Sequence, residues 1–237
     1  MQTGSYLAEI FFILVEPAVP GNIGASARAI KTMGFRRMRM VNPADHLCME
    51  ALTMAHGSHD ILEQAEIYDT FEEAIQDLDF VAGTTAKHKN AHWDYFALDT
   101  LPGFLKSRKS MIRKAGIVFG KEESGLSNAH LRACDVMVYI PMQTTFPSLN
   151  LSQAVMVIAY TLSLSQINQK PPAPVPTGPE PGFRQLTGKI EDSMNRIGIL
   201  KGTPLYHRIR ERISLLGEKD MHLLLSVIKH LDKTLNK

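Results

Sequence analysis

Cysteine is scarce in this sequence, with only Cys48 and Cys134 among 237 residues. Two thiols cannot form a disulfide framework, and they cannot by themselves supply the four ligands of a structural zinc site. Histidine does not supply the missing metal ligands, because even close pairs such as His56 and His59 are spaced like ordinary surface residues. We therefore expect no bound metal, and two packed or unreactive thiols in a reducing cytoplasm.

Long apolar runs are also missing. The best candidate, residues 154–164, is far shorter than the ~20 residues that a membrane-spanning helix needs. The apolar stretch at residues 10–15 has no basic leader and runs directly into Glu16 and Pro17, which is unlike a signal peptide. We expect a soluble, cytoplasmic protein without a membrane partner.

Charge is unevenly distributed, although the formal net charge is only +2. Residues 183–237 carry 11 Lys and Arg against 6 Asp and Glu, whereas residues 1–182 carry 15 against 18. A basic appendage on a mildly acidic body favours a polyanionic partner.

Proline marks one boundary. Residues 169–182 contain six of the chain's 13 prolines, so this segment can neither form a helix nor pair in a sheet, and it tends to be a semi-rigid spacer. The sequence therefore predicts a domain at residues 1–168, a linker at residues 169–182 and a helical extension at residues 183–237. The extension should hold three amphipathic helices, at residues 183–197, 204–216 and 218–235.

Strand-like and helix-like segments alternate through residues 1–168. The strand candidates are short and mostly apolar on both faces, as in a buried parallel sheet; they are residues 9–15, 37–41, 80–83, 116–119 and 136–140. Helices are expected at residues 23–33, 70–77, 127–133 and 149–166. This order predicts an α/β fold with an open, mostly parallel sheet and helices on both sides.

Ligands in such folds bind beyond the carboxyl ends of the strands, so the loops after the strands are informative. The first loop contains the pattern NxGxxxR, formed by Asn22, Gly24 and Arg28. Glycine permits a tight turn, and we expect Asn22 just outside the next helix as its N-cap. Arg28 should lie about one turn into that helix. A capped helix with a solvated arginine is the simpler alternative.

A second loop, GKEESGL at residues 120–126, follows the fourth strand candidate. It is neither a P-loop nor a dinucleotide fingerprint, and its acidic side chains would repel phosphate. Such a loop suits a cationic or neutral ligand that backbone groups approach; a plain turn is the alternative.

A third loop follows the last strand candidate, which should end at Pro141. It contains Ser-Leu-Asn at residues 148–150, where Ser148 or Asn150 can cap the long apolar helix that follows. Taken alone, such a segment is more often a cap than a catalytic group.

The three patterns occur in the order of the three signature motifs of one superfamily. The chain resembles the TrmH-like SPOUT RNA methyltransferases, and is most similar to the TrmJ group and the LasT-type proteins. GTTAK at residues 83–87 and VNP at residues 41–43 add to the resemblance. It covers residues 9–168 and continues more weakly into the C-terminal helices.

This resemblance implies a deep trefoil knot late in the α/β domain, bound S-adenosyl-L-methionine, and a homodimer whose active site takes residues from both chains. It implies a cofactor pocket made by Thr84, Thr85, Gly120, Glu122, Ile140, Ser148 and Leu149. It further implies that Arg28 acts on a ribose 2′-hydroxyl, with Asn22, Ser148 and Asn150 positioning the hydroxyl and Arg28.

The chemistry of methyl transfer fits these groups. A ribose hydroxyl is a poor nucleophile, so catalysis needs in-line alignment and a polar neighbour for its proton. Arginine is a weak candidate for a base because its pKa in water exceeds about 12. The sequence leaves open whether burial depresses that pKa or Arg28 only stabilises the developing alkoxide.

The resemblance implies an RNA substrate, with tRNA expected and cytidine or uridine 32 of the anticodon loop as the target. Ribosomal RNA and a non-catalytic RNA-binding role are the alternatives; a nicotinamide enzyme is disfavoured because GxGxxG is missing. One departure is Lys87, where the TrmJ pattern has arginine. The extension should contact tRNA phosphates, with Arg208, Arg210 and Arg212 spreading positive charge around their helix; a dimer brace is the alternative.

Overall fold

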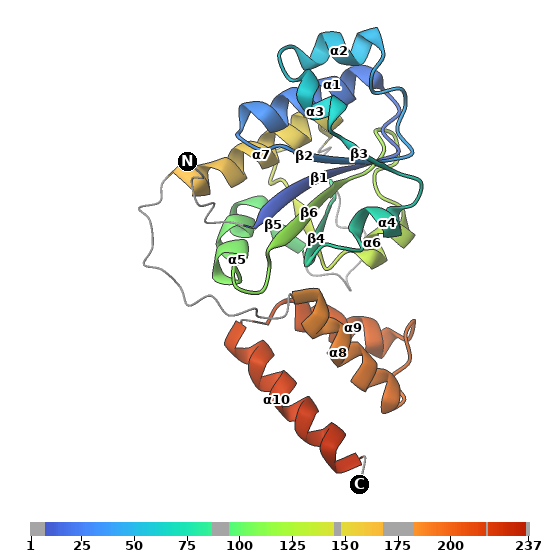
Figure 1. Ribbon diagram of the computed structural model, residues 1–237, viewed down its shortest axis with the longest axis vertical. Helices are drawn as coiled ribbons and strands as arrows, with labels where there is room; N and C mark the ends of the chain where they lie inside the picture. The colour runs from blue at the N-terminus through green and yellow to red at the C-terminus, as the bar shows by residue number, and fades with distance from the viewer. Residues whose placement is uncertain (1–7, 87–94, 145–147, 168–182, 217, 236–237) are drawn as a thin grey trace.

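The computed structural model describes residues 8–86, 95–144, 148–167, 183–216 and 218–235. Within these ranges, seven parallel strands form one sheet in the order β3-β2-β1-β6-β4-β7-β5 (Figure 1). The strands are β1 (Glu9–Val15), β2 (Arg37–Val41), β3 (Glu66–Tyr68), β4 (Phe80–Thr84), β5 (Tyr95–Ala97), β6 (Lys114–Phe119) and β7 (Val136–Tyr139). The expected open α/β sheet is confirmed, and every strand pair in it is parallel.

Helices cover both faces of the sheet, as expected (Figure 1). One face packs against α1 (Pro20–Thr32), α2 (Met49–Ala55), α3 (His59–Glu63), α5 (Leu101–Ser107) and α7 (Leu151–Ile167); the other packs against α4 (Phe71–Ile75) and α6 (Asn128–Ala133). In β1, Phe12 belongs to the first core and Phe11 to the second. Successive side chains point to opposite faces, so a strand covered on both sides is apolar throughout.

The sequence pattern misses several short elements, although it predicts the equally short α4 and α6. The edge strands β3 and β5 have three residues each and are only partly buried, so they carry no clear hydrophobic period. The helices α2, α3 and α5 have seven, five and seven residues, and a short 3-10 turn (Leu98–Thr100) precedes α5. Periodicity identifies an element only when several turns or alternations repeat.

Helices α1 and α2 approach closely at Gly24. A Cβ atom at this position would lie 2.0 Å from the carbonyl oxygen of Ala51 and 3.0 Å from the backbone nitrogen of Ala55. Only glycine permits that approach, because backbone atoms cannot move aside as a flexible side chain can. The glycine of the first motif is thus required by helix packing, and α1 carries the other residues of that motif.

The extension contains the three expected helices, α8 (Phe183–Arg196), α9 (Pro204–Ser214) and α10 (Glu218–Leu235). Arg108, which precedes β6 and is only 6% exposed, ties α9 to the body. Its guanidinium donates to the carbonyl oxygen of Leu216 at 2.9 Å and to that of Leu215, and it lies 3.9 Å from the centre of the Phe104 ring. A cation at a helix C-terminus satisfies carbonyl groups that the helix leaves unpaired.

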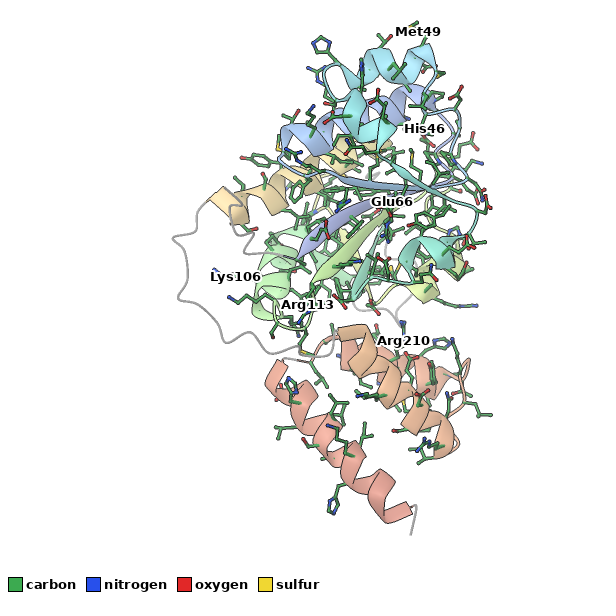
Figure 2. The ribbon with its side chains drawn as sticks, viewed as in Figure 1. His46, Met49, Glu66, Lys106, Arg113 and Arg210 are labelled. Atoms are coloured by element: carbon green, nitrogen blue, oxygen red, sulfur yellow. The ribbon has the colours of Figure 1, made fainter. Side chains whose placement is uncertain are left out.

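A second arginine joins the two parts from the other side: Arg210 of α9 faces the body (Figure 2). Arg210 donates to the buried Asp135 at 3.2 Å and to Glu191 of α8 at 2.8 Å. Asp135 comes just before β7, and its other oxygen accepts the backbone N–H of Val81 at 2.8 Å. The expectation that Arg210 contributes to an outward basic surface was therefore wrong, because its guanidinium is used in docking the extension.

The linker expected at residues 169–182, like Lys87, lies outside the described residues. The domain division and the trefoil knot stay predictions. Across the described ranges, no helix combines the length and the apolarity needed to cross a bilayer.

We predict that Gly24→Ala forces α1 and α2 apart and lowers the free energy of unfolding by about 1–3 kcal/mol, as overpacking does. Urea denaturation measures this. The matched control is Gly188→Ala in α8, where a Cβ would meet no atom within 4 Å; this change should stabilise by up to about 1 kcal/mol. Equal stability of Gly24→Ala and the unmodified protein would contradict the packing argument.

Candidate functional site

The loops of the three motifs meet at the carboxyl edge of the sheet. β1 pairs with β6, β6 with β4, and β4 with β7, so the residues after these strands are neighbours. This register places Thr84, Thr85, Gly120 and Ile140 at one edge. The backbone N–H of Thr85 donates to the carbonyl of Val138 at 3.0 Å, which extends the β4–β7 pairing by one residue.

Glu122 is the central contact between the first and second motif loops. Its carboxylate accepts hydrogen bonds from the backbone N–H groups of Ala18 at 3.0 Å and Val19 at 3.3 Å. It also accepts one from the side-chain amide of Asn22 at 3.0 Å. These residues are about 100 positions apart in the chain, so sequence spacing gives no sign of the contact.

The third motif joins through Asn150, whose amide nitrogen donates to the side-chain oxygen of Asn22 at 2.8 Å. The oxygen of Asn150 accepts the backbone N–H of Ser152 at 2.9 Å. A carboxylate only accepts, and a backbone N–H only donates. Glu122, Asn22, Asn150 and Ser152 thus form a series of hydrogen bonds. The carboxylate at one end and the N–H group at the other fix the orientation of the side-chain amides of Asn22 and Asn150.

The helix starts differ in part from expectation. Asn150 caps α7, as one of the two expected alternatives. Asn22, however, is not an N-cap: α1 begins at Pro20, its N-cap is Val19 without a side-chain hydrogen bond, and Asn22 is the third helical residue. Ser148 is exposed, and within the described ranges no hydrogen bond is recorded for it.

The pKa of Glu122 lies below its ordinary value. Partial burial disfavours the charged carboxylate and raises the pKa, but the hydrogen bonds from Asn22, Ala18 and Val19 together lower it more. Glu122 is therefore ionised at neutral pH and holds the loop after β1 in place.

The glycines of the second motif allow its loop to fold back on itself. A Cβ at Gly120 would lie 2.1 Å from the carbonyl carbon of Gly125, and Gly125 has a φ of +67°. Glycine adopts this left-handed conformation at little cost. The narrow loop directs the Glu122 side chain toward α1.

Arg28 is exposed and lies apart from this network. It is six residues beyond Asn22 in α1, which corresponds to about 9 Å along the helix axis and about 120° around it. The structure thus brings Asn22, Glu122 and Asn150 together in one protomer, and leaves Arg28 on another side of the same helix.

Glu50 of α2 is a site residue that the sequence did not reveal. Its carboxylate accepts the backbone N–H of Gly21 at 3.1 Å. Together, Glu50 and Glu122 use N–H groups at the start of α1, so this helix end is not an open site for phosphate. No sequence pattern links Glu50 to the first motif, because the contact depends on how α2 packs on α1.

The described part of the chain contains no group of three or more His, Cys, Asp and Glu side chains that could hold a metal ion. Neither Cys48 nor Cys134 forms a disulfide within the described residues, and Cys134 is buried.

Residues 9–160 match the model of the SpoU rRNA Methylase family. The chain is 35% identical over 229 residues to the uncharacterized tRNA/rRNA methyltransferase LasT of Escherichia coli (strain K12), covering 96% of this chain and 99% of that one. It is 36% identical over 162 residues to the tRNA (cytidine-2′-O-)-methyltransferase TrmJ of Methanocaldococcus jannaschii, covering 68% of this chain and 70% of that one.

Solved structures have the same fold. TrmJ from Z. mobilis ZM4 superposes with a TM-score of 0.65 at 26% identity, over 95% of this chain and 100% of that one. The SpoU methyltransferase AviRb from Streptomyces viridochromogenes, in complex with the cofactor AdoMet, gives a TM-score of 0.55 at 21% identity, over 68% of this chain and 62% of that one.

We predict that Glu122→Gln destabilises the protein by about 1 kcal/mol at pH 7, because a carboxamide offers one acceptor oxygen where three N–H donors converge. Since the folded-state pKa of Glu122 is lowered, its stabilisation is present above the ordinary glutamate pKa and is lost as the pH falls through the lowered value. Urea unfolding at pH 7 and pH 3 measures this. A stability difference between the two proteins that stays constant down to pH 3 would disprove the role of the charge.

Proposed function

We propose that this chain methylates a ribose 2′-hydroxyl of tRNA. It belongs to the SpoU rRNA methylase family and is an S-adenosylmethionine-dependent RNA methyltransferase. The observation that carries this proposal is the hydrogen-bonded chain Glu122–Asn22–Asn150, which joins all three motif loops at one edge of the sheet. The name of the M. jannaschii relative supports both the tRNA substrate and the 2′-oxygen.

The cofactor is assigned to the loops after β4, β6 and β7. Thr84, Thr85 and Gly120 offer backbone groups there, while Ile140 and Leu149 offer apolar surface next to Ser148. The acidic character of residues 120–126 fits a sulfonium cation and disfavours a phosphorylated nucleotide. S-adenosylmethionine supplies the methyl group. Because the Glu122 carboxylate is engaged by α1, we assign Glu122 to shaping this loop, and not to direct contact with the cofactor.

The amides of Asn22 and Asn150 hold the ribose in line with the methyl donor. Their orientation is fixed before any substrate arrives, so little reorganisation is needed during the reaction. After its hydrogen bonds to Glu122 and Asn150, the Asn22 amide keeps one N–H donor and one acceptor lone pair for a hydroxyl. The Asn150 oxygen already accepts the N–H and the hydroxyl of Ser152, so Asn150 keeps one N–H donor.

Arg28 acts on the 2′-hydroxyl from a second protomer. Within one chain, Arg28 lies about 9 Å along the axis of α1 from Asn22 and about 120° around it, so the two side chains leave the helix in different directions. A site shared between two copies removes this conflict. Arg28 then either takes up the proton or stabilises the developing alkoxide.

The outward side of α7 provides a surface for such a homodimer. Tyr160 is 52% exposed and Leu164 is 38% exposed, and Val157 is partly exposed beside them. At spacings of three, four and seven residues these side chains share one side of the helix. An apolar seam in this position favours a second copy as its cover.

The target is assigned to cytidine or uridine 32 in the anticodon loop of tRNA. Ribosomal RNA is the second candidate, because the LasT relative is described as a tRNA/rRNA methyltransferase. Nucleoside mass spectrometry of tRNA and rRNA from a strain lacking the gene, compared with the parent strain, distinguishes the two. Loss of a 2′-O-methylated nucleoside from rRNA alone would replace the tRNA proposal.

We predict that Arg28→Ala abolishes methyl transfer and leaves the affinity for S-adenosylmethionine within a few-fold. A group used only in the transition state changes turnover and not cofactor binding. Transfer from a radiolabelled methyl donor measures the first quantity, and calorimetry the second. Arg36→Ala, at an exposed arginine before β2, is the matched control and should retain activity. Unchanged turnover in Arg28→Ala would remove the residue from the mechanism.

We also predict a dimer in the absence of RNA. Light scattering at micromolar concentration should give about twice the 26.4 kDa of one chain. Tyr160→Asp should shift the mass toward that of a monomer, because it places a charge in the apolar seam. A monomeric unmodified protein is incompatible with the shared site.

A further inference from the structure

A basic segment at the amino edge of the sheet has no role in the site described above. Residues 106–114 contain five Lys and Arg and no acidic residue. The segment runs from the end of α5 to the start of β6. It therefore lies at the opposite edge of the sheet from the three motif loops.

At least two of these five cations, Arg108 and Lys114, have structural partners. Arg108 is buried and binds the carbonyl groups at the end of α9. Lys114 forms an ion pair with Asp77 at 2.8 Å. The nearby Asp79 accepts the backbone N–H groups of Arg113 and Lys114, so it is a local acid that partly offsets the positive charge.

Lys106, Lys109 and Arg113 are exposed. Figure 2 shows Lys106 and Arg113 on the part of the body nearest to the extension. For Lys106 and Lys109, no ion pair is recorded with any residue of the described ranges. Packing does not require charge at these two positions, which distinguishes them from Arg108 and Lys114.

The buried Arg108 connects this segment to the extension. Because Arg108 binds the carbonyl groups just past the end of α9, the segment that carries Lys106 and Lys109 is fixed to the extension at that point. On α9 itself, Arg208 and Arg212 are exposed and four residues apart, so they share one side of the helix. Body and extension thus both present cations around a fixed junction.

We propose that Lys106 and Lys109 form a docking surface for the phosphate backbone of the RNA substrate, at a distance from the methylated nucleotide. This inference rests on the proposed function. β6 separates the surface from the motif loops by six residues, or about 20 Å at 3.3 Å per residue. The surface therefore contacts phosphates several nucleotides from the target ribose, and fixes the orientation of the RNA without reading its sequence.

Fluorescence anisotropy with a labelled, unmodified tRNA transcript tests the proposal. The variant Lys106→Glu/Lys109→Glu should weaken tRNA binding by about tenfold or more at 0.1 M salt. The slope of log affinity against log salt should become shallower by about 1.5, because two phosphate contacts are lost. The variant Lys106→Arg/Lys109→Arg keeps the charge and should bind nearly as the unmodified protein does.

Arg36→Glu is the matched control. Arg36 is exposed and lies before β2, which β1 separates from β6 in the sheet; this change should have a smaller effect on tRNA affinity. Thermal melting and the affinity for S-adenosylmethionine should match the unmodified protein in every variant. If the glutamate variant fails to fold, Lys106→Gln/Lys109→Gln gives the same test with a smaller expected effect.

Unchanged tRNA affinity and salt slope in Lys106→Glu/Lys109→Glu would overturn the proposal. Loss of binding to phosphatidylserine vesicles, with tRNA binding intact, would also overturn it and assign the surface to a membrane. Methyl transfer by the unmodified protein is measured separately. A protein that binds tRNA through these lysines and methylates none would disprove the proposed function and leave the docking surface in place.

Discussion

The site depends on one carboxylate placed at the start of one helix. α1 has no side-chain cap at its first turn, so its N–H groups need acceptors from elsewhere. Glu122 accepts the N–H groups of Ala18 and Val19, just before α1, from a loop about 100 residues away, and Glu50 accepts that of Gly21. Through Asn22, Glu122 fixes Asn150 as well. A single ionised group therefore holds three chain segments in one arrangement, and its pKa is lowered as a result.

Close backbone packing explains why the first two motifs contain glycine. Gly24 allows α1 to approach α2, whose Glu50 also binds the start of α1. Gly120 allows its loop to fold tightly enough for Glu122 to reach across. Both glycines act through backbone geometry, while the polar residues beside them fix hydrogen bonds. Within one motif, the glycine therefore serves backbone packing, while the polar residue serves hydrogen bonding.

The extension is docked through charge as well as apolar contact. Arg210 forms an ion pair with the buried Asp135, and Arg108 donates to a carbonyl group at the end of α9. Asp135 and Arg108 both lie near the amino ends of strands. Methylation is assigned to the carboxyl edge, so the extension of one chain lies away from that chain's own motif loops. On our proposal, its exposed cations, like Lys106 and Lys109, contact RNA remote from the target nucleotide.

The sequence alone determined the fold class, the long strands and helices, and the order of the three motifs, because these depend on local periodicity and on residues close in the chain. It could not place Asn22 inside α1, reveal Glu50, or show that Arg210 faces the body. It also gave no sign that Glu122 binds the loop after β1. Apart from the start of α1 at Pro20, each of these facts is a contact between segments 19 to 104 residues apart. Only tertiary packing decides such contacts, because it sets which polar groups lie close enough to form hydrogen bonds with each other.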